Sequence, residues 1–276
     1  MMRKRRFELT IAATGGSRIL VGDDIGNETC TDLFLCLPGI LETRDSFNEL
    51  ALWMGPAVRI MTVDWCGRGE SQRLGHAHEY RMSVYLNDLS TIYAYAIGAL
   101  SRHPRGTRPR IHLVGTSMGG LLAVFFAARK PQLLGTVVLN DIGPFLPWSG
   151  ILSLMIGLSS AKTEELNQLS DATAADLAER LSVDPLLLRA VRQPGHLDLP
   201  HETKLAGIDF SGAFGSITAA LLLLRGKNSE IISDNVVKRL FEIQSLTQIY
   251  ECEKSGHPVR YSEETCRAIL DFTARH

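Results

Sequence analysis

Short apolar runs rich in β-branched residues recur along the chain, and segments with the helical spacing of apolar residues separate them. Parallel strands need a crossover connection that is usually a helix, so this alternation predicts an α/β fold, a mostly parallel sheet with helices on both faces. In such a sheet, ligands bind in the loops at the carboxyl ends of the strands. The predicted strands are 33–37, 58–63, 111–114, 136–139, 221–224 and, more weakly, 247–250. The predicted helices are 82–100, 118–129, 234–244 and 262–274. An opening hairpin is predicted from the segments 7–13 and 19–23.

The alternation stops between residues 144 and 210. Helical patterns occupy 151–159, 162–169 and 174–181, a fourth begins near Pro185, and no buried strand is evident. We therefore expect a helical cap at 144–210, inserted between two parts of one core domain, 1–143 and 211–276. The start of the insertion is strongly apolar, so Phe145, Trp148 and Leu152 either pack on the core or line a substrate pocket, and both can hold together.

Composition excludes several classes of protein. A formal net charge of -1 over 276 residues gives no basic face for nucleic acid. No apolar run reaches the roughly 18 residues of a membrane span. The basic run at 3–6 lacks the apolar stretch of a signal peptide and is interpreted as a solvated tail. The expected partner is a small-molecule substrate, and the sequence leaves a homodimer open.

The five cysteines are odd in number and irregularly spaced, with no CxxC pair. This pattern argues against a disulfide framework or a zinc site. Free thiols suit a reducing compartment, so we expect a cytoplasmic protein without a metal or organic cofactor.

The strongest local motif is G-x-S-x-G at residues 115–119, centred on Ser117. It lies between a predicted strand and a predicted helix, which is the context that this motif requires. Glycines flank the serine because the turn is too tight for side chains. Ser117 is thus a candidate nucleophile at the carboxyl end of the sheet.

A serine nucleophile needs a base, and His257 is the best placed of eight histidines. It lies in the loop between the last predicted strand and the last predicted helix, which can extend over the serine.

The carboxylate that would orient the base is less certain from the sequence. Glu230 follows the strand 221–224 and gives the chain order serine, acid, histidine. Asp141 follows the strand 136–139 and is the second candidate; Asp234 is the third. For Asp141, a structural role in its own turn is the competing interpretation.

Acyl transfer also requires an oxyanion hole. The backbone N–H of Met118, next to the nucleophile, is one expected donor. The second should come from the loop after the strand 33–37, where we assign the N–H of Ile40 and expect Gly39 to allow close approach of the backbone.

With these motifs in place, the chain resembles the α/β-hydrolase fold family, and within it the capped esterase, lactonase and carbon–carbon hydrolase branch. Residues 63–71 are similar to the family's D-x-R-G-x-G-x-S turn, and 221–230 to its L-L-L-x-G-x-x-S-D segment. The resemblance implies an eight-stranded, mostly parallel sheet, a helical cap after strand 6, and a triad of Ser117, His257 and a carboxylate.

The chain departs from the family pattern at four places. Pro38-Gly39 replaces the frequent His-Gly, Cys66 replaces the usual arginine, and Glu230 stands for the usual aspartate. Pro258 replaces the tryptophan that is typical of the carbon–carbon hydrolases and argues mildly against that activity.

The predicted function is that of a carboxylesterase-like serine hydrolase, which cleaves an ester, lactone or related acyl bond of a small to medium, partly apolar substrate. Carbon–carbon bond hydrolysis, thioester hydrolysis and perhydrolysis use nearly the same site and stay open. So does a ligand-binding protein without turnover, because fold alone does not settle function.

Overall fold

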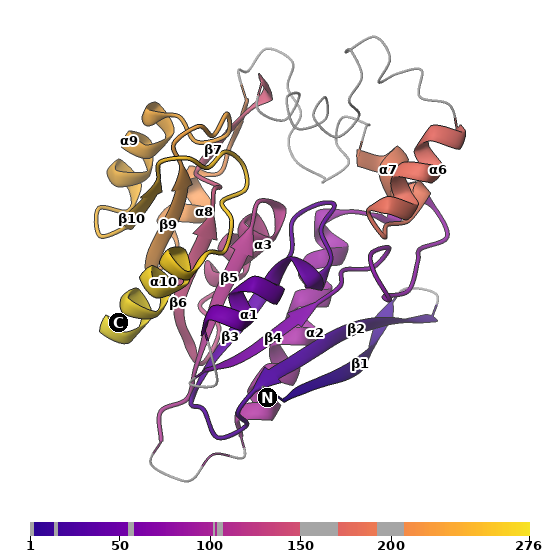
Figure 1. The fold of residues 1–276 in the computed structure, drawn as a ribbon, viewed down its shortest axis with the longest axis horizontal. Coiled ribbons are helices and arrows are strands. Elements are labelled where there is room, and N and C mark those ends of the chain that lie inside the picture. Colours follow the sequence, from indigo (N-terminus) through magenta and orange to yellow (C-terminus); the bar gives the residue numbers. More distant parts are fainter. Residues whose placement is uncertain are drawn as a thin grey trace.

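A computed structural model describes residues 3–13, 16–54, 58–101, 103, 107–149, 171–191 and 207–276. Its central feature is an eight-stranded sheet in the order β1-β2-β4-β3-β5-β6-β9-β10 (Figure 1). β1 with β2 and β2 with β4 are antiparallel, and the remaining neighbours are parallel. The predicted fold class is confirmed, including the opening hairpin.

The sheet strands are β1 (Lys4–Ala13), β2 (Gly16–Gly26), β3 (Asp32–Leu37), β4 (Arg59–Val63), β5 (Arg110–Thr116), β6 (Leu134–Asn140), β9 (Ala220–Gly226) and β10 (Gln248–Cys252). The helices are α1 (Asn48–Met54), α2 (Met82–Leu100), α3 (Met118–Ala127), α6 (Asp171–Arg180), α7 (Pro185–Val191), α8 (Ser211–Gly215), α9 (Asp234–Ile243) and α10 (Glu263–Arg275), with 3-10 turns at Arg44–Phe47 and Ala77–Glu79.

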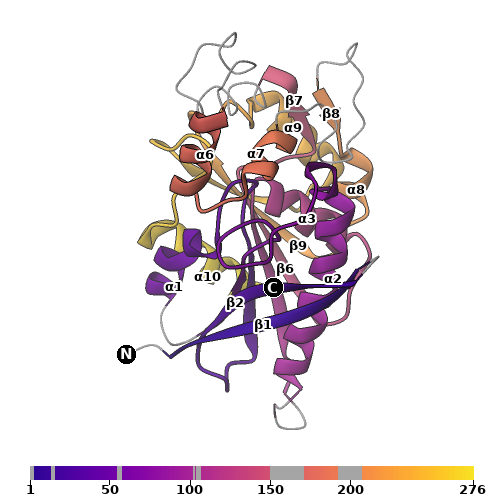
Figure 2. The ribbon, with the colours of Figure 1, turned by 90° about the vertical axis from the view of Figure 1, so that its right-hand side faces the viewer.

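Helices cover both faces of the sheet. α1 and α10 lie on one face, and α2, α3 and α8 lie on the other (Figure 2). β3 shows why: Leu35 is buried against the face of α2 and α3, and its neighbours Phe34 and Cys36 are buried against the face of α1 and α10. A strand that is buried on both faces gives a continuous apolar run, which is the pattern in the sequence.

Between β6 and β9 the chain leaves the sheet and returns. The structure contains the helix predicted at 174–181, as α6, and the one predicted near Pro185, as α7. The helices predicted at 151–159 and 162–169 lie outside the described residues.

The sequence predicted no buried strand in this stretch, and the structure contains two short, partly buried strands there. β7 (Phe145–Pro147) and β8 (Gly207–Asp209) form an antiparallel pair where the insertion begins and ends. Three residues, one of them a proline, are too few to display the alternation of polar and apolar positions that identifies a strand.

Among the helices in the described ranges, none has the length and apolarity required to cross a bilayer. The carboxyl ends of β5, β6 and β9 lie together at the edge of the sheet toward the insertion, and the loops that follow them carry the residues considered next (Figure 1).

Candidate active site

Ser117 occupies a sharp turn between β5 and α3. Its backbone has φ 50° and ψ -114°, a conformation that side-chain-bearing residues seldom adopt. A β-carbon at Gly119 would lie 2.0 Å from the carbonyl oxygen of Leu37, and one at Gly115 would lie 2.5 Å from the backbone of Gly119. Since such approaches exclude any side chain, both glycines are required for the turn that presents the serine at the end of β5.

The turn lies beside Asp141. In the parallel pair of β5 and β6, Thr116 is opposite Asn140, and the N–H of Ser117 donates to the carbonyl of Asn140 at 3.1 Å. Asp141 follows directly. Neighbouring strands are about 4.8 Å apart, so the nucleophile and this carboxylate leave the sheet side by side.

His257 forms a hydrogen bond with Asp141. Its Nδ1 lies 2.8 Å from Oδ2 of the carboxylate, and the two side chains are 7% and 0% exposed. Oδ1 accepts the N–H of Gly226 at 2.9 Å, and Oδ2 also accepts the hydroxyl of Ser229. A carboxylate that serves as acceptor to all three neighbours requires the Nδ1–H tautomer of the ring, which leaves Nε2 able to accept a proton. Among the hydrogen bonds of the described residues, none joins Ser117 directly to His257.

The loop that carries His257 is attached to the ends of β5 and β6. The Asn140 side chain donates to the carbonyl of Val259 at 2.7 Å and accepts its N–H at 2.9 Å. The hydroxyls of Thr116 and Tyr261 are 2.8 Å apart. Sequence reasoning missed Asn140 and Tyr261, although Asn140 directly precedes Asp141, because their partners lie more than a hundred residues away in the chain.

The three candidate acids differ in where they lie relative to His257. Glu230, the first choice, is exposed, and the loop after β9 contacts the site through the preceding residue, Ser229, whose hydroxyl bonds to Asp141. Asp234, the third choice, begins α9 and pairs with Arg225. Asp141, the second choice, is the carboxylate that lies against His257.

The two assigned oxyanion donors lie on backbones that approach each other. Met118 follows Ser117 and begins α3. At the next residue, a β-carbon on Gly119 would be 2.7 Å from the carbonyl of Pro38. Ile40 lies two residues beyond Pro38. Within the described part of the chain, the N–H groups of Met118 and Ile40 have no protein acceptor, so both remain available to a ligand.

Glu42 is a second residue that the sequence analysis missed. Its carboxylate accepts the N–H of Gly39 at 2.7 Å, and the Trp65 indole donates to the carbonyl of Pro38 at 3.0 Å. Burial raises the pKa of Glu42, while the hydrogen bond from Gly39 and the charge of His257 act in the opposite direction. A half-buried carboxyl therefore lies within electrostatic range of the histidine and holds the loop that carries Ile40.

The residues suggested for a pocket are only partly described. Phe145 and Trp148 are partly exposed and pack against the main core cluster, and the guanidinium of Arg239 lies 5.8 Å from the Phe145 ring centroid. Leu152 lies outside the described residues.

Comparison with known proteins places this geometry in context. Residues 32–182 match the family described as the alpha/beta hydrolase fold. The chain is 29% identical over 119 residues to the 3-hydroxybutyrate-oligomer hydrolase of Cupriavidus necator, covering 43% of this chain and 37% of that protein. It is 29% identical over 182 residues to 2-hydroxy-6-oxononadienedioate/2-hydroxy-6-oxononatrienedioate hydrolase 1 of Pseudomonas putida, covering 59% and 62%. These matches thus span about 37 to 62% of the relatives' own lengths.

Solved structures share the fold of this chain. An alpha/beta hydrolase from Novosphingobium aromaticivorans superimposes with a TM-score of 0.74 at 22% identity, covering 100% of both chains. At that identity the likeness concerns the fold. The family match extends over more than half of the chain and includes the turn at residues 115–119 that carries Ser117. The chain belongs to the α/β-hydrolase fold family.

Proposed function

We propose that this protein is a serine hydrolase in which Ser117 is the nucleophile, His257 the general base and Asp141 the residue that orients the base. The observation that carries the proposal is the 2.8 Å contact between His257 Nδ1 and Asp141 Oδ2, next to the strained backbone of Ser117. Nucleophile, base and orienting acid are the three roles that acyl transfer by a serine requires.

The reaction begins when Ser117 Oγ attacks the substrate carbonyl carbon and its proton passes to His257 Nε2. The N–H groups of Ile40 and Met118 stabilise the tetrahedral oxyanion. The C–O bond to the leaving alcohol then breaks, and that alcohol takes the proton from His257. Water attacks the acyl-enzyme with His257 again as base, which releases the acid and restores the serine.

The proposed substrate is a small to medium ester or lactone with an apolar part. Residues 144–210 would form the cap over the site, with Phe145 and Trp148 at its beginning. This part of the proposal rests on the apolar start of the insertion and on its position between β6 and β9. No metal or organic cofactor takes part in the steps above.

Carbon–carbon bond hydrolysis is the second candidate. It is favoured by the relative from Pseudomonas putida, whose name is that of a 2-hydroxy-6-oxononadienedioate hydrolase. The same nucleophile and base can serve either reaction, so substrate preference must decide between them.

The test is hydrolysis of p-nitrophenyl esters of increasing chain length, and of a 2-hydroxy-6-oxo-dienoate, by the wild type and by Ser117→Ala. Loss of the serine can reduce turnover on the order of a millionfold. Ester cleavage that vanishes in Ser117→Ala supports the first proposal; preference for the dienoate supports the second. Turnover that persists in Ser117→Ala would exclude both.

A further inference from the structure

Arg68 is a buried arginine beside the oxyanion loop. Its side chain is only 1% exposed, which is rare for a charged residue unless it is paired. Its Nε donates to the carbonyl of Ile40 at 2.7 Å, and its terminal nitrogens lie 2.9 Å from the carbonyl of Cys66 and 4.0 Å from Sδ of Met118. One guanidinium therefore contacts both residues that carry the proposed oxyanion donors.

The turn that presents Arg68 is built from the D-x-x-G-x-G-x-S residues. The carboxylate of Asp64 accepts the N–H groups of Arg44 and Glu70, and the Ser71 hydroxyl donates to the Asp64 carbonyl at 2.7 Å. A β-carbon at Gly69, whose φ is 50°, would lie 2.1 Å from that carboxylate. The motif is thus a rigid turn, and it fixes the position of the guanidinium.

Residues 182–184 of the insertion cover this turn. The N–H of Gly69 donates to the carbonyl of Ser182, and the N–H of Asp184 donates to the carbonyl of Gly67, each at 2.7 Å. Between them, the backbones of Arg68 and Val183 form an isolated antiparallel β-bridge. These residues lie against the turn that carries the buried guanidinium, and a charge in a water-poor site acts more strongly on its surroundings.

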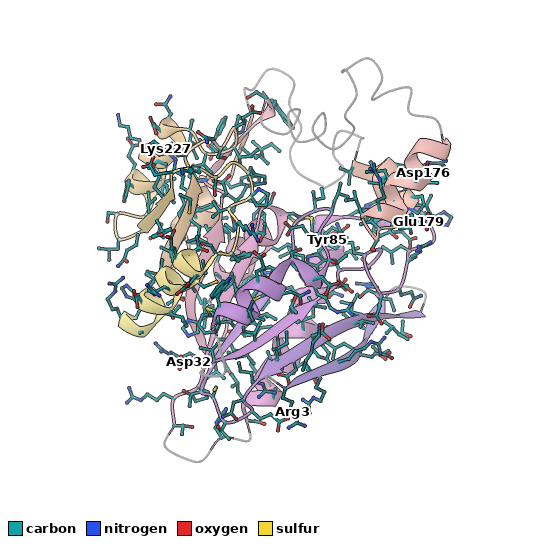
Figure 3. All side chains as sticks on the ribbon, in the orientation of Figure 1. Arg3, Asp32, Tyr85, Asp176, Glu179 and Lys227 are labelled. Atoms are coloured by element: carbon teal, nitrogen blue, oxygen red, sulfur yellow. The ribbon has the colours of Figure 1, made fainter. Side chains whose placement is uncertain are left out.

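The charge of Arg68 has no carboxylate partner in the described part of the chain. Tyr85, which lies in the interior in Figure 3, packs with its ring centroid 5.0 Å from the guanidinium carbon. Burial raises the pKa of Tyr85 and of the Cys66 thiol to about 12, so both groups remain neutral. The nearby carboxylate of Asp88 is paired with Arg18.

We propose that Arg68 is a positioning residue of the oxyanion hole: it holds the loop that carries Ile40, contacts Met118, and adds positive potential where the oxyanion forms. This inference rests on the proposed function, because it assigns a role to Arg68 only if an oxyanion develops at Ser117. Preorganised positive potential stabilises a transition state more than a neutral ground state. The effect should therefore fall on kcat and leave KM nearly unchanged.

The test compares Arg68→Met and Arg68→Lys with a control, Arg59→Met, which removes a buried arginine that is paired with Asp24. The measurements are kcat and KM for a p-nitrophenyl ester, inhibition by a trifluoromethyl ketone, which forms an anionic adduct with serine, and the melting temperature. For Arg68→Met we expect kcat to fall on the order of a hundredfold, with a parallel weakening of inhibition and KM within a few-fold. Arg68→Lys keeps the charge but not the planar fork and should lose on the order of tenfold.

Arg59→Met should lower the melting temperature and leave kcat and inhibition unchanged. The inference is overturned if Arg68→Met lowers only the melting temperature, as the control does. If Arg68→Met fails to fold, Arg68→Lys decides: wild-type kcat and inhibition in that variant would also overturn the inference. Failure of the proposed function is a separate result, in which wild-type protein neither turns over esters nor binds the ketone at Ser117.

Discussion

His257 Nδ1 and Asp141 Oδ2 lie 2.8 Å apart, although 116 residues separate them in the chain. The contact joins the loop after β10 to the end of β6, one strand away from the nucleophile on β5. It defines the tautomer of the proposed base, His257, and it singles out Asp141 as the carboxylate whose loss should matter most.

Replacing the two competing acids should give opposite results. Asp141→Asn keeps the shape of the side chain but favours the wrong tautomer of His257, so kcat should fall by about 10⁴. Glu230→Gln changes an exposed side chain and should leave kcat within about twofold of wild type, which steady-state ester hydrolysis will show. A large loss in Glu230→Gln with little loss in Asp141→Asn would reverse the assignment.

Asn140→Ala should weaken both the fold and the catalysis. It removes the acceptor and the donor that hold Val259, and each buried polar group left unsatisfied costs about 1–3 kcal/mol. We expect a lower free energy of unfolding in urea and a lower kcat, because the loop that carries His257 is released.

Thr136→Val is the matched control for Asn140→Ala. Thr136 is buried in the same strand and bonds to His112, away from the catalytic residues. It should lower stability without changing kcat. Equal kcat values in the two variants would mean that the Asn140 contact with Val259 does not position the histidine.

Glu42→Gln should make the protein more stable at neutral pH relative to the wild type. Burial raises the pKa of Glu42 above its unfolded value of about 4.3, so the ionised form is disfavoured in the folded state. The stability of the wild type relative to Glu42→Gln is therefore greatest at a pH below the unfolded pKa. This relative stability is lost as the pH rises through the folded pKa. Urea unfolding at pH 4 to 8 should show the difference growing with pH in favour of Glu42→Gln.

Glu70→Gln serves as a control with the opposite sign. The hydrogen bond from Arg44 lowers the pKa of Glu70, so its carboxylate stabilises the fold above about pH 4.3 and the contribution is lost as the pH falls. The wild type should be the more stable protein at neutral pH in this pair. A difference between wild type and Glu42→Gln that does not vary with pH would refute the assignment of a buried, ionising Glu42.

The sheet, its helices and the elbow could be predicted because they depend on local patterns. The apolar periods of strands and helices can be detected in short runs of consecutive residues. The spacing of Gly115, Ser117 and Gly119 follows from the geometry of one turn. β7 and β8 were not predicted because three residues are too few to show a repeating pattern of polar and apolar positions.

The contact between Asp141 and His257 could not be predicted, because it depends on which of two strand ends turns its side chain toward the histidine. Asp141 has a left-handed φ of 54°, and the hydroxyl of Ser229 bonds to it from the other strand end. The contacts of Arg68 and Glu42 could not be predicted for a similar reason. Both side chains bond to the backbone of the loop that carries Ile40, and the sequence of that loop does not indicate which side chains bond to it.

The most direct measurement of the central claim is mass spectrometry of the folded protein after brief treatment with a fluorophosphonate, with Ser117→Ala treated in parallel. An activated serine beside a base and an oxyanion hole reacts with this probe, whereas an ordinary serine does not. We predict a single adduct, located on the peptide that contains Ser117 and absent from Ser117→Ala. A folded wild-type protein that gains no adduct, or an adduct that persists in Ser117→Ala, would contradict the assignment of Ser117 as a catalytic nucleophile.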